Sequence, residues 1–224
     1  MANQTACIIC GGQSFEPGPS GRLTHNGLEP RCGNCRSLER HRTLRLIYNA
    51  IPDSFLGAAN CLQFAPDRAA PRDRFASFEI SVYGGKNHLD MMRIDRADGS
   101  YGWVVANHVI EHLANDLAGM GELMRIAGTR GIVQVTVPAP KARLRTKVLP
   151  SPDNITRFHF HTYGSDFPQK MKPALGGGAG IAAIATDPCT GSWDVAYFFS
   201  ASQSRLFDLG TALIGGGVAV LICV

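Results

Sequence analysis

Two pairs of cysteines near the start of the chain have the spacing of a metal site. Cys7 and Cys10 form one CxxC motif, Cys32 and Cys35 form a second, and 21 residues separate the two motifs. Each motif places two thiolates on one tight turn, so four sulfurs can converge on one Zn²⁺ ion with tetrahedral geometry. Four thiolates leave no coordination position open, and we therefore expect this metal to stabilise structure rather than to carry out chemistry.

The composition between the two motifs favours a metal over a packed core. This stretch is rich in glycine and proline and poor in apolar side chains, so metal binding would have to supply its folding free energy. Two disulfides are the alternative, but no secretory signal precedes Cys7, and the cytosol keeps such thiols reduced. We therefore expect zinc and a cytoplasmic location, with Cys61, Cys189 and Cys223 as buried, apolar side chains.

A second group of reactive side chains follows the apolar run Trp103–Ala106. Ionisable side chains at the end of a buried strand are costly unless they form a site. A neutral imidazole, with an unperturbed pKa of about 6.5, suits general-base catalysis at neutral pH. We predict that His108, His112 or His161 is catalytic. The alternatives are that His112 orients the start of a helix and that His161 lies on the surface.

The length and composition predict a globular protein with more than one part. The 224 residues are enough for one α/β domain and a small module, and 45% of them are hydrophobic. A net charge of +4 is too small to indicate nucleic-acid binding. No internal segment approaches the roughly 20 apolar residues of a membrane span. Leu209–Val224 has no charged residue but is broken by Gly215–Gly217, so we expect a last strand in the core, with a tail anchor as the alternative.

Periodicity predicts a helix followed by alternating strands and helices. Ser37 is a candidate N-cap for a helix that ends near Asn49, with Leu44 on its apolar side and Arg42 among the arginines on its outer side. Apolar runs predict strands at 60–65, 78–83, 103–109, 131–137, 181–186 and 195–200.

A helix between the third and fourth strands begins at Asn115 or Asp116 and ends at Gly128. A strand, helix and strand in this order give a right-handed crossover, and such sheets bind ligands beyond the carboxyl ends of their strands. We expect the basic segment Pro138–Pro152 to form a loop over this edge, with a basic rim beside the site as the alternative.

Several of these segments resemble a known family. Asn107–Leu113 (NHVIEHL), Glu122–Ile126 and the strand that ends at Pro138 resemble the fourth and fifth strands of class I S-adenosylmethionine-dependent methyltransferases, of the type 11-like group. Cys7–Arg42 resembles the zinc ribbon that some bacterial members carry, and His161–Phe167 resembles the segment after the fifth strand.

This resemblance implies an α/β, Rossmann-like sheet, mostly parallel with an antiparallel last strand, behind a small zinc ribbon. The expected divisions are a zinc ribbon at 1–36, a connecting helix at 37–57, a methyltransferase-like domain at 58–200 and an apolar C-terminal segment at 201–224.

The resemblance also implies where S-adenosylmethionine binds. Phe64, Ala65 and Pro66 stand where the family has its glycine-rich loop, and Ala65 is the smallest residue there to allow close backbone approach. The acid that normally ends the second strand is missing, so Glu79 or Tyr83 would contact the ribose.

Two further positions complete the implied cofactor site. Asp95 matches the acid that accepts a hydrogen bond from the adenine amino group, although it could equally form a turn. Asn107 and His108 would face the methionine part and the transferred methyl group.

The implied function is methyl transfer from S-adenosylmethionine to an acceptor that is either a small metabolite or RNA. Asn107 is followed by His108 and Val109, which departs from the Asn/Asp-Pro-Pro-Tyr signature of enzymes that methylate exocyclic amino groups of bases. The missing glycines and ribose acid favour an alternative, an inactive methyltransferase fold whose ribbon binds nucleic acid or protein. A dehydrogenase would need a GxGxxG motif after the first strand, which is absent.

Overall fold

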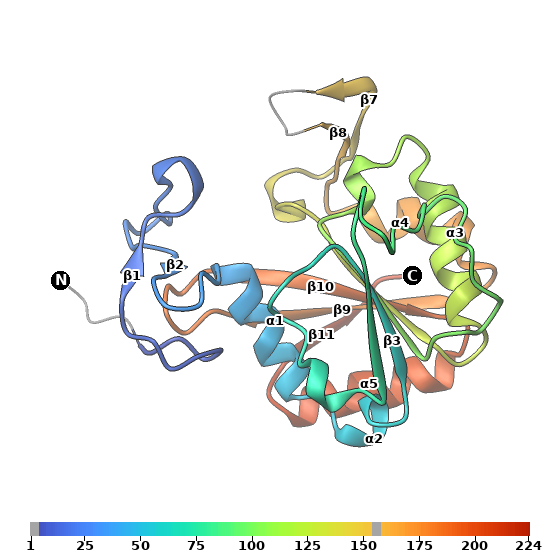
Figure 1. Ribbon diagram of the computed structural model, residues 1–224, viewed down its shortest axis with the longest axis horizontal. Helices are drawn as coiled ribbons and strands as arrows, with labels where there is room; N and C mark the ends of the chain where they lie inside the picture. The colour runs from blue at the N-terminus through green and yellow to red at the C-terminus, as the bar shows by residue number, and fades with distance from the viewer. Residues whose placement is uncertain (1–4, 154–157) are drawn as a thin grey trace.

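The centre of the protein is a mixed seven-stranded sheet with strand order β11-β9-β10-β6-β5-β3-β4 (Figure 1). The computed structural model describes residues 5–153 and 158–224. Neighbouring strands among β4, β3, β5 and β6 pair in parallel, whereas β10 is antiparallel to both β6 and β9, and β11 is antiparallel to β9. The strands are β3 (Asn60–Phe64), β4 (Ser77–Ser81), β5 (Trp103–Asn107), β6 (Ile132–Thr136), β9 (Ala179–Thr186), β10 (Trp193–Ser200) and β11 (Ala219–Ile222).

Helices cover both faces of this sheet (Figure 1). One face carries α1 (Glu39–Asn49), α2 (Asp53–Leu56) and α5 (Gln203–Gly215), and the other carries α3 (Asp116–Ala127) and α4 (Phe167–Met171). The remaining helical turns are short 3-10 helices at Pro19–Gly21, Arg72–Arg74, Ile110–His112 (η3), Pro140–Ala142 and Lys172–Leu175.

The predicted α/β fold and its six strands are confirmed. Trp103, Val105 and Ile132 pack on the face of α1, while Val104 and Val133 pack on the face of α3. Strands with apolar side chains on both faces are typical of a sheet covered by helices on both sides.

The predicted helix between β5 and β6 is also confirmed. Asn115 is its N-cap, with Oδ1 accepting a hydrogen bond from the Ala118 N–H at 3.0 Å. Gly128 ends it with a φ of 66°, in the left-handed region that glycine adopts without strain.

Two expectations for the first helix are wrong. The helix begins at Glu39 with Leu38 at its N-cap, whereas the Ser37 hydroxyl lies 3.3 Å from Cys7 Sγ and 3.2 Å from Cys35 Sγ. Arg42 is completely buried rather than on an outer face. Both residues contact the N-terminal cysteine module, the segment that carries the two CxxC motifs and packs beside the helix.

The segment expected to form a loop after β6 is partly a β-hairpin. β7 (Lys147–Asp153) pairs antiparallel with β8 (His159–Thr162), and the hairpin projects from the sheet in Figure 1. The prediction of a loop is therefore wrong from Lys147 on, where β7 begins. The pairing of β7 with β8 is irregular between Val148 and Asp153, the stretch that contains Pro150 and Pro152.

The C-terminal residues fold onto the sheet. A last strand is present as β11, but it lies at the edge of the sheet beside β9 with mostly exposed side chains, so its predicted place in the core is wrong. Helix α5 was not predicted; it buries Leu206, Leu209 and Leu213 against the sheet. In residues 5–153 and 158–224, no helix is both long enough and apolar enough to span a membrane.

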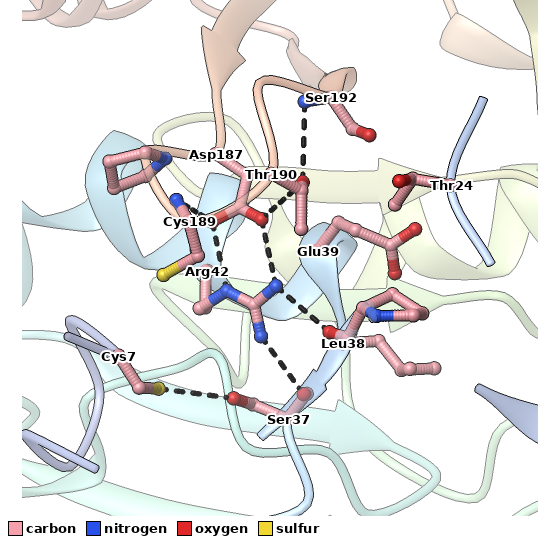
Figure 2. A network of polar contacts seen from close by, with 12 residues as sticks. Cys7, Thr24, Ser37, Leu38, Glu39, Arg42, Asp187, Cys189, Thr190 and Ser192 are labelled. Atoms are coloured by element: carbon pink, nitrogen blue, oxygen red, sulfur yellow. Dashed lines mark hydrogen bonds and ion pairs between the residues drawn. The ribbon is translucent and has the colours of Figure 1, made fainter. Parts of the chain in front are cut away.

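The N-terminal module contains the short strands β1 (Phe15–Glu16) and β2 (Arg31–Cys32) and is anchored through Arg42 (Figure 2). The Arg42 guanidinium donates to both carboxylate oxygens of Asp187, in the turn between β9 and β10. It also donates to the carbonyl oxygens of Pro30 and Ser37. One buried side chain thus joins the module, α1 and the sheet.

Candidate functional site

The four cysteines of the two CxxC motifs lie together. The sulfurs of Cys7, Cys10, Cys32 and Cys35 are all within 4.8 Å of one another, with 3.8 Å between Cys7 and Cys35 and 3.6 Å between Cys10 and Cys32. A tetrahedral zinc ion with Zn–S bonds of about 2.3 Å requires sulfurs about 3.8 Å apart, whereas a disulfide requires about 2.05 Å. The cluster therefore fits a zinc ion and does not fit two disulfides.

The backbone of each motif forms the tight turn that brings its two sulfurs together. The Gly11 N–H donates to the Cys7 carbonyl at 2.7 Å, and the Arg36 N–H donates to the Cys32 carbonyl at 2.9 Å. The cysteines outside the motifs are free thiols: Cys61 and Cys189 are buried as expected, and Cys223 is half-buried.

A second cluster of polar side chains lies where β3, β5 and β6 end. The Asn107 side-chain oxygen Oδ1 accepts hydrogen bonds from Gln134 Nε2 at 2.8 Å and from Thr136 Oγ1 at 3.1 Å. The Asn107 side-chain nitrogen Nδ2 donates to Asp67 Oδ2 at 2.6 Å. Asn107 therefore ties the loop after β3 to β6, and its orientation is fixed.

Sequence reasoning identified Asn107 but missed its partners. Gln134, one of these partners, and Gln63, which donates to the Ala65 carbonyl oxygen, are both fully buried between apolar residues of their strands. A glutamine inside an apolar run is the signal that could have identified this polar layer, since a buried amide needs hydrogen-bond partners.

A small pocket at this edge lies between α1 and the ends of β5, β6 and β10. Asp67, Asn107, His108 and Thr136 line one side. The other lining residues come from α1 and from the start of β10: Arg40, His41, Thr43, Leu44, Ile47, Asp194, Val195 and Ala196.

Burial alters the ionisation of the groups around this pocket. It lowers the pKa of Arg40, raises that of Asp194 and, together with the nearby Arg40 charge, lowers the pKa of His41 to about 4. His41 is thus neutral at pH 7, and its Nδ1 accepts a hydrogen bond from the Leu38 N–H at 2.9 Å. Within the described residues Arg40 forms no hydrogen bond or ion pair, although the carboxylates of Asp67 and Asp194 act on its charge, so its guanidinium N–H groups are available to an anionic ligand.

Two residues at this edge have left-handed backbone conformations that are rare outside glycine. Ala65, directly after β3, has a φ of 61°, and His108, directly after β5, has a φ of 53°. Non-glycine residues in this region are strained and occur often at functional sites. The loop after β3 thus has the conformation that glycine adopts most readily, although glycine itself is absent.

The other predicted cofactor residues differ in burial and surroundings. Phe64 is buried at the end of β3, whereas Pro66 and Asp95 are exposed and Tyr83 is 91% exposed. Glu79 lies in the middle of β4.

The Glu79 carboxylate is bonded within the fold. It accepts hydrogen bonds from Arg96 Nη2 and from the Tyr101 hydroxyl, each at 2.5 Å. Burial raises the pKa of Glu79, but these hydrogen bonds outweigh it and hold that pKa below its ordinary value.

The three predicted catalytic histidines have different surroundings. The His108 ring nitrogen Nδ1 lies 3.7 Å from Glu111 Oε1. His112 is exposed. His161 is 3% exposed, stacks on Tyr163 and has Nδ1 3.6 Å from an Asp116 oxygen. Burial lowers the pKa of His161 despite that carboxylate, so its ring is neutral at pH 7.

No protein-family model and no curated protein matches this chain. Solved structures that it is similar to include an S-adenosylmethionine-dependent methyltransferase from Thermotoga maritima, with 11% identity and a TM-score of 0.44 over 72% of this chain and 91% of the other. A second is the Burkholderia thailandensis 1,6-didemethyltoxoflavin-N1-methyltransferase with bound 1,6-didemethyltoxoflavin and S-adenosylhomocysteine, with 9% identity and a TM-score of 0.46 over 69% and 77%. A third is an S-adenosylmethionine-dependent methyltransferase from Methanosarcina mazei, with 8% identity and a TM-score of 0.40 over 69% and 94%.

Proposed function

We propose that this protein is a methyltransferase that uses S-adenosylmethionine. The observation that carries the proposal is the left-handed Ala65 beside the Asn107 network, at the edge where the parallel strands β3, β5 and β6 end. This edge is where open α/β sheets bind their ligands. The motif Asn107–Leu113, which resembles that of class I methyltransferases, begins at the same point.

In this proposal the loop after β3 approaches the cofactor with its backbone. Phe64, Ala65 and Pro66 form that loop, and Ala65 presents only a methyl group to the cofactor. Asn107 holds the loop in place through Asp67.

The remaining cofactor contacts follow from charge and exposure. Arg40, in the pocket under α1, would bind the carboxylate of the methionine part. Tyr83 and Asp95 would contact the ribose and the adenine. Tyr83 suits the ribose better than Glu79, whose carboxylate already accepts two hydrogen bonds.

The main task of the protein in this reaction would be to position the reacting groups. Transfer of a methyl group from a sulfonium is an in-line displacement, so the nucleophile, the methyl carbon and the sulfur must be held in a row. A base is needed only when the nucleophile carries a proton. His108 is the candidate that directly follows β5 and lines the pocket, with His112 and His161 as the other candidates.

The cysteine module has a structural role in this proposal. A zinc ion bound by Cys7, Cys10, Cys32 and Cys35 would fold the module, and Arg42 fixes that module against α1. A cytoplasmic location and a small-molecule or RNA acceptor are parts of the same proposal.

Calorimetric titration of the zinc-loaded protein with S-adenosylmethionine and with S-adenosylhomocysteine tests the proposal. We expect binding of both, and we expect Arg40→Gln to weaken it about tenfold because a charge-assisted contact is lost. Arg130→Gln, a change at an exposed arginine that precedes β6 and is not among the residues of this pocket, is the matched control and should bind normally. If neither ligand binds, the proposal is overturned. That result would support the alternative, an inactive fold whose ribbon binds nucleic acid or protein.

A further inference from the structure

Three side chains of types that can bind a metal meet beside the proposed active site. Glu111 and His112 lie in the 3-10 helix η3 directly after β5, and His159 begins β8 of the projecting hairpin (Figure 1). One ligand atom from each of the three lies within 4.8 Å of the others. These residues are separate from the cysteine cluster, and the fold brings them together from distant parts of the chain.

The carboxylate of Glu111 is the strongest indication that something binds there. Glu111 is 1% exposed, and its Oε2 is buried with no hydrogen-bond partner. Its Oε1 lies 3.7 Å from His108 Nδ1, which is beyond hydrogen-bond distance. A buried carboxylate oxygen without a hydrogen-bond partner is costly, and a cation beside Oε2 would remove that cost.

The two histidines are arranged so that both rings can serve as ligands. Their centroids are 4.7 Å apart with an interplanar angle of 78°. His112 Nδ1 lies 3.4 Å from the Phe158 carbonyl oxygen. A proton on that nitrogen would leave Nε2 of His112 to bind a metal, an arrangement common among metal-bound histidines.

We propose that Glu111, His112 and His159 bind a divalent transition-metal ion. Two imidazoles and one carboxylate suit Mn²⁺, Fe²⁺, Co²⁺ or Zn²⁺, whereas Mg²⁺ and Ca²⁺ prefer sites made of oxygen alone. Three protein ligands leave coordination positions open, as in catalytic metal sites.

This site would specify the acceptor, an inference that rests on the proposed methyl transfer. A hydroxyl group on the metal would have a lowered pKa and would lose its proton to His108 or to solvent. The oxygen would then form a bond to the methyl carbon while the bond from that carbon to sulfur breaks, and S-adenosylhomocysteine leaves. The acceptor class is therefore a molecule with a hydroxyl group that can bind a metal.

Titration of the zinc-loaded protein with Mn²⁺, followed by loss of the electron paramagnetic resonance signal of free Mn²⁺, tests the site. Mn²⁺ prefers oxygen and nitrogen ligands to thiolates, so it leaves the cysteine cluster undisturbed. We expect one saturable Mn²⁺ site per chain and at least a tenfold loss of affinity in Glu111→Gln and in His159→Ala. The matched control His25→Ala, at an exposed histidine of the N-terminal module, should bind Mn²⁺ normally.

The outcomes separate this inference from the proposed function. Absence of a saturable Mn²⁺ site, or an affinity unchanged in folded Glu111→Gln and His159→Ala, would overturn the metal site. Cofactor binding is measured on the same protein without Mn²⁺. Cofactor binding without Mn²⁺ binding would therefore refute the metal site and leave methyl transfer standing. Mn²⁺ binding without cofactor binding would refute methyl transfer and the acceptor assignment and leave the metal site standing. Melting temperatures establish that each variant is folded, and His159→Ala serves as the variant outside η3.

Discussion

Arg42 and Asp187 form a doubly hydrogen-bonded ion pair with both side chains fully buried. Arg42 Nε lies 2.8 Å from Asp187 Oδ1 and Nη2 lies 2.7 Å from Oδ2, as Figure 2 shows. Burial alone would lower the pKa of Arg42, but the contacts with Asp187 raise it above its ordinary value. The Thr190 hydroxyl and the Cys189 N–H donate to the same carboxylate, so each buried oxygen of Asp187 accepts two hydrogen bonds.

We predict that Arg42→Met destabilises the protein by about 3–5 kcal/mol, because Asp187 is left buried without its partner. Urea unfolding measures the loss. The matched control is Arg22→Met. It removes the ion pair between Arg22 and Glu39, in which the Arg22 side chain is 46% exposed, and it should lower the free energy of unfolding by less than about 1 kcal/mol. An equal loss of unfolding free energy in the two variants would show that the buried pair stabilises the protein no more than the exposed pair does.

The double variant Arg42→Met/Asp187→Leu separates the pair from simple packing. Because it removes both charges, we expect it to lose less stability than the sum of the two single variants. A loss equal to that sum would mean that the two side chains act independently.

The position of Arg42 shows why part of this fold was not predictable from local sequence. Helical periodicity placed Arg42 on the outer side of α1, and that side is covered by the cysteine module and by a turn 145 residues away in the chain. By contrast, the strands of the sheet were predictable because their apolar runs are continuous. The hairpin of β7 and β8 was missed because Pro150 and Pro152 interrupt its first strand.

The candidate sites also include features that local sequence predicts and contacts that depend on the fold. The cysteine cluster was predictable since each CxxC motif is local and its spacing alone brings two sulfurs together. Asn107 was identified from the end of an apolar run, but its contacts with Gln134 and Asp67 depend on which strands are neighbours. The contact of His159 with His112 depends on a hairpin that the sequence did not reveal.

We predict that the purified protein contains one zinc ion, bound by the four clustered cysteines. Cys35→Ser should lose most of this zinc, because three thiolates bind it much more weakly than four. Metal analysis after gel filtration gives the zinc content. Cys223→Ser changes a half-buried thiol outside the cluster and should retain the full amount. Equal zinc content in the two variants would contradict the assignment.

Replacing Ala65 by glycine should stabilise the protein by about 0.5–1 kcal/mol. Ala65 has a φ of 61°, which is strained for alanine and free for glycine. The urea midpoint should rise, and affinity for S-adenosylmethionine should not fall. Ala76→Gly is the matched control, since Ala76 is an exposed coil residue without a positive φ, and it should be slightly destabilising. A lowered midpoint for Ala65→Gly would mean that the loop does not hold this conformation in solution.

Acidification should destabilise the protein in part through His41. Burial and the neighbouring Arg40 charge lower the pKa of folded His41 to about 4, whereas the unfolded residue has a pKa of about 6.5. Between these values the unfolded state binds a proton that the folded state does not, so stability falls as the pH drops from about 6.5 to about 4. Above pH 7 both states are neutral and the effect is absent.

The variant His41→Gln isolates this contribution, because its side-chain oxygen can still accept the hydrogen bond from the Leu38 N–H. Urea unfolding between pH 7 and pH 4.5 should show that wild type loses about 2 kcal/mol more than the variant. Acid also protonates the cysteine thiolates, but it does so equally in both proteins, and only the difference between them reports on His41. His25→Gln, at an exposed histidine, should behave like wild type. If the curves of wild type and His41→Gln run parallel over this range, His41 is not held neutral by the fold.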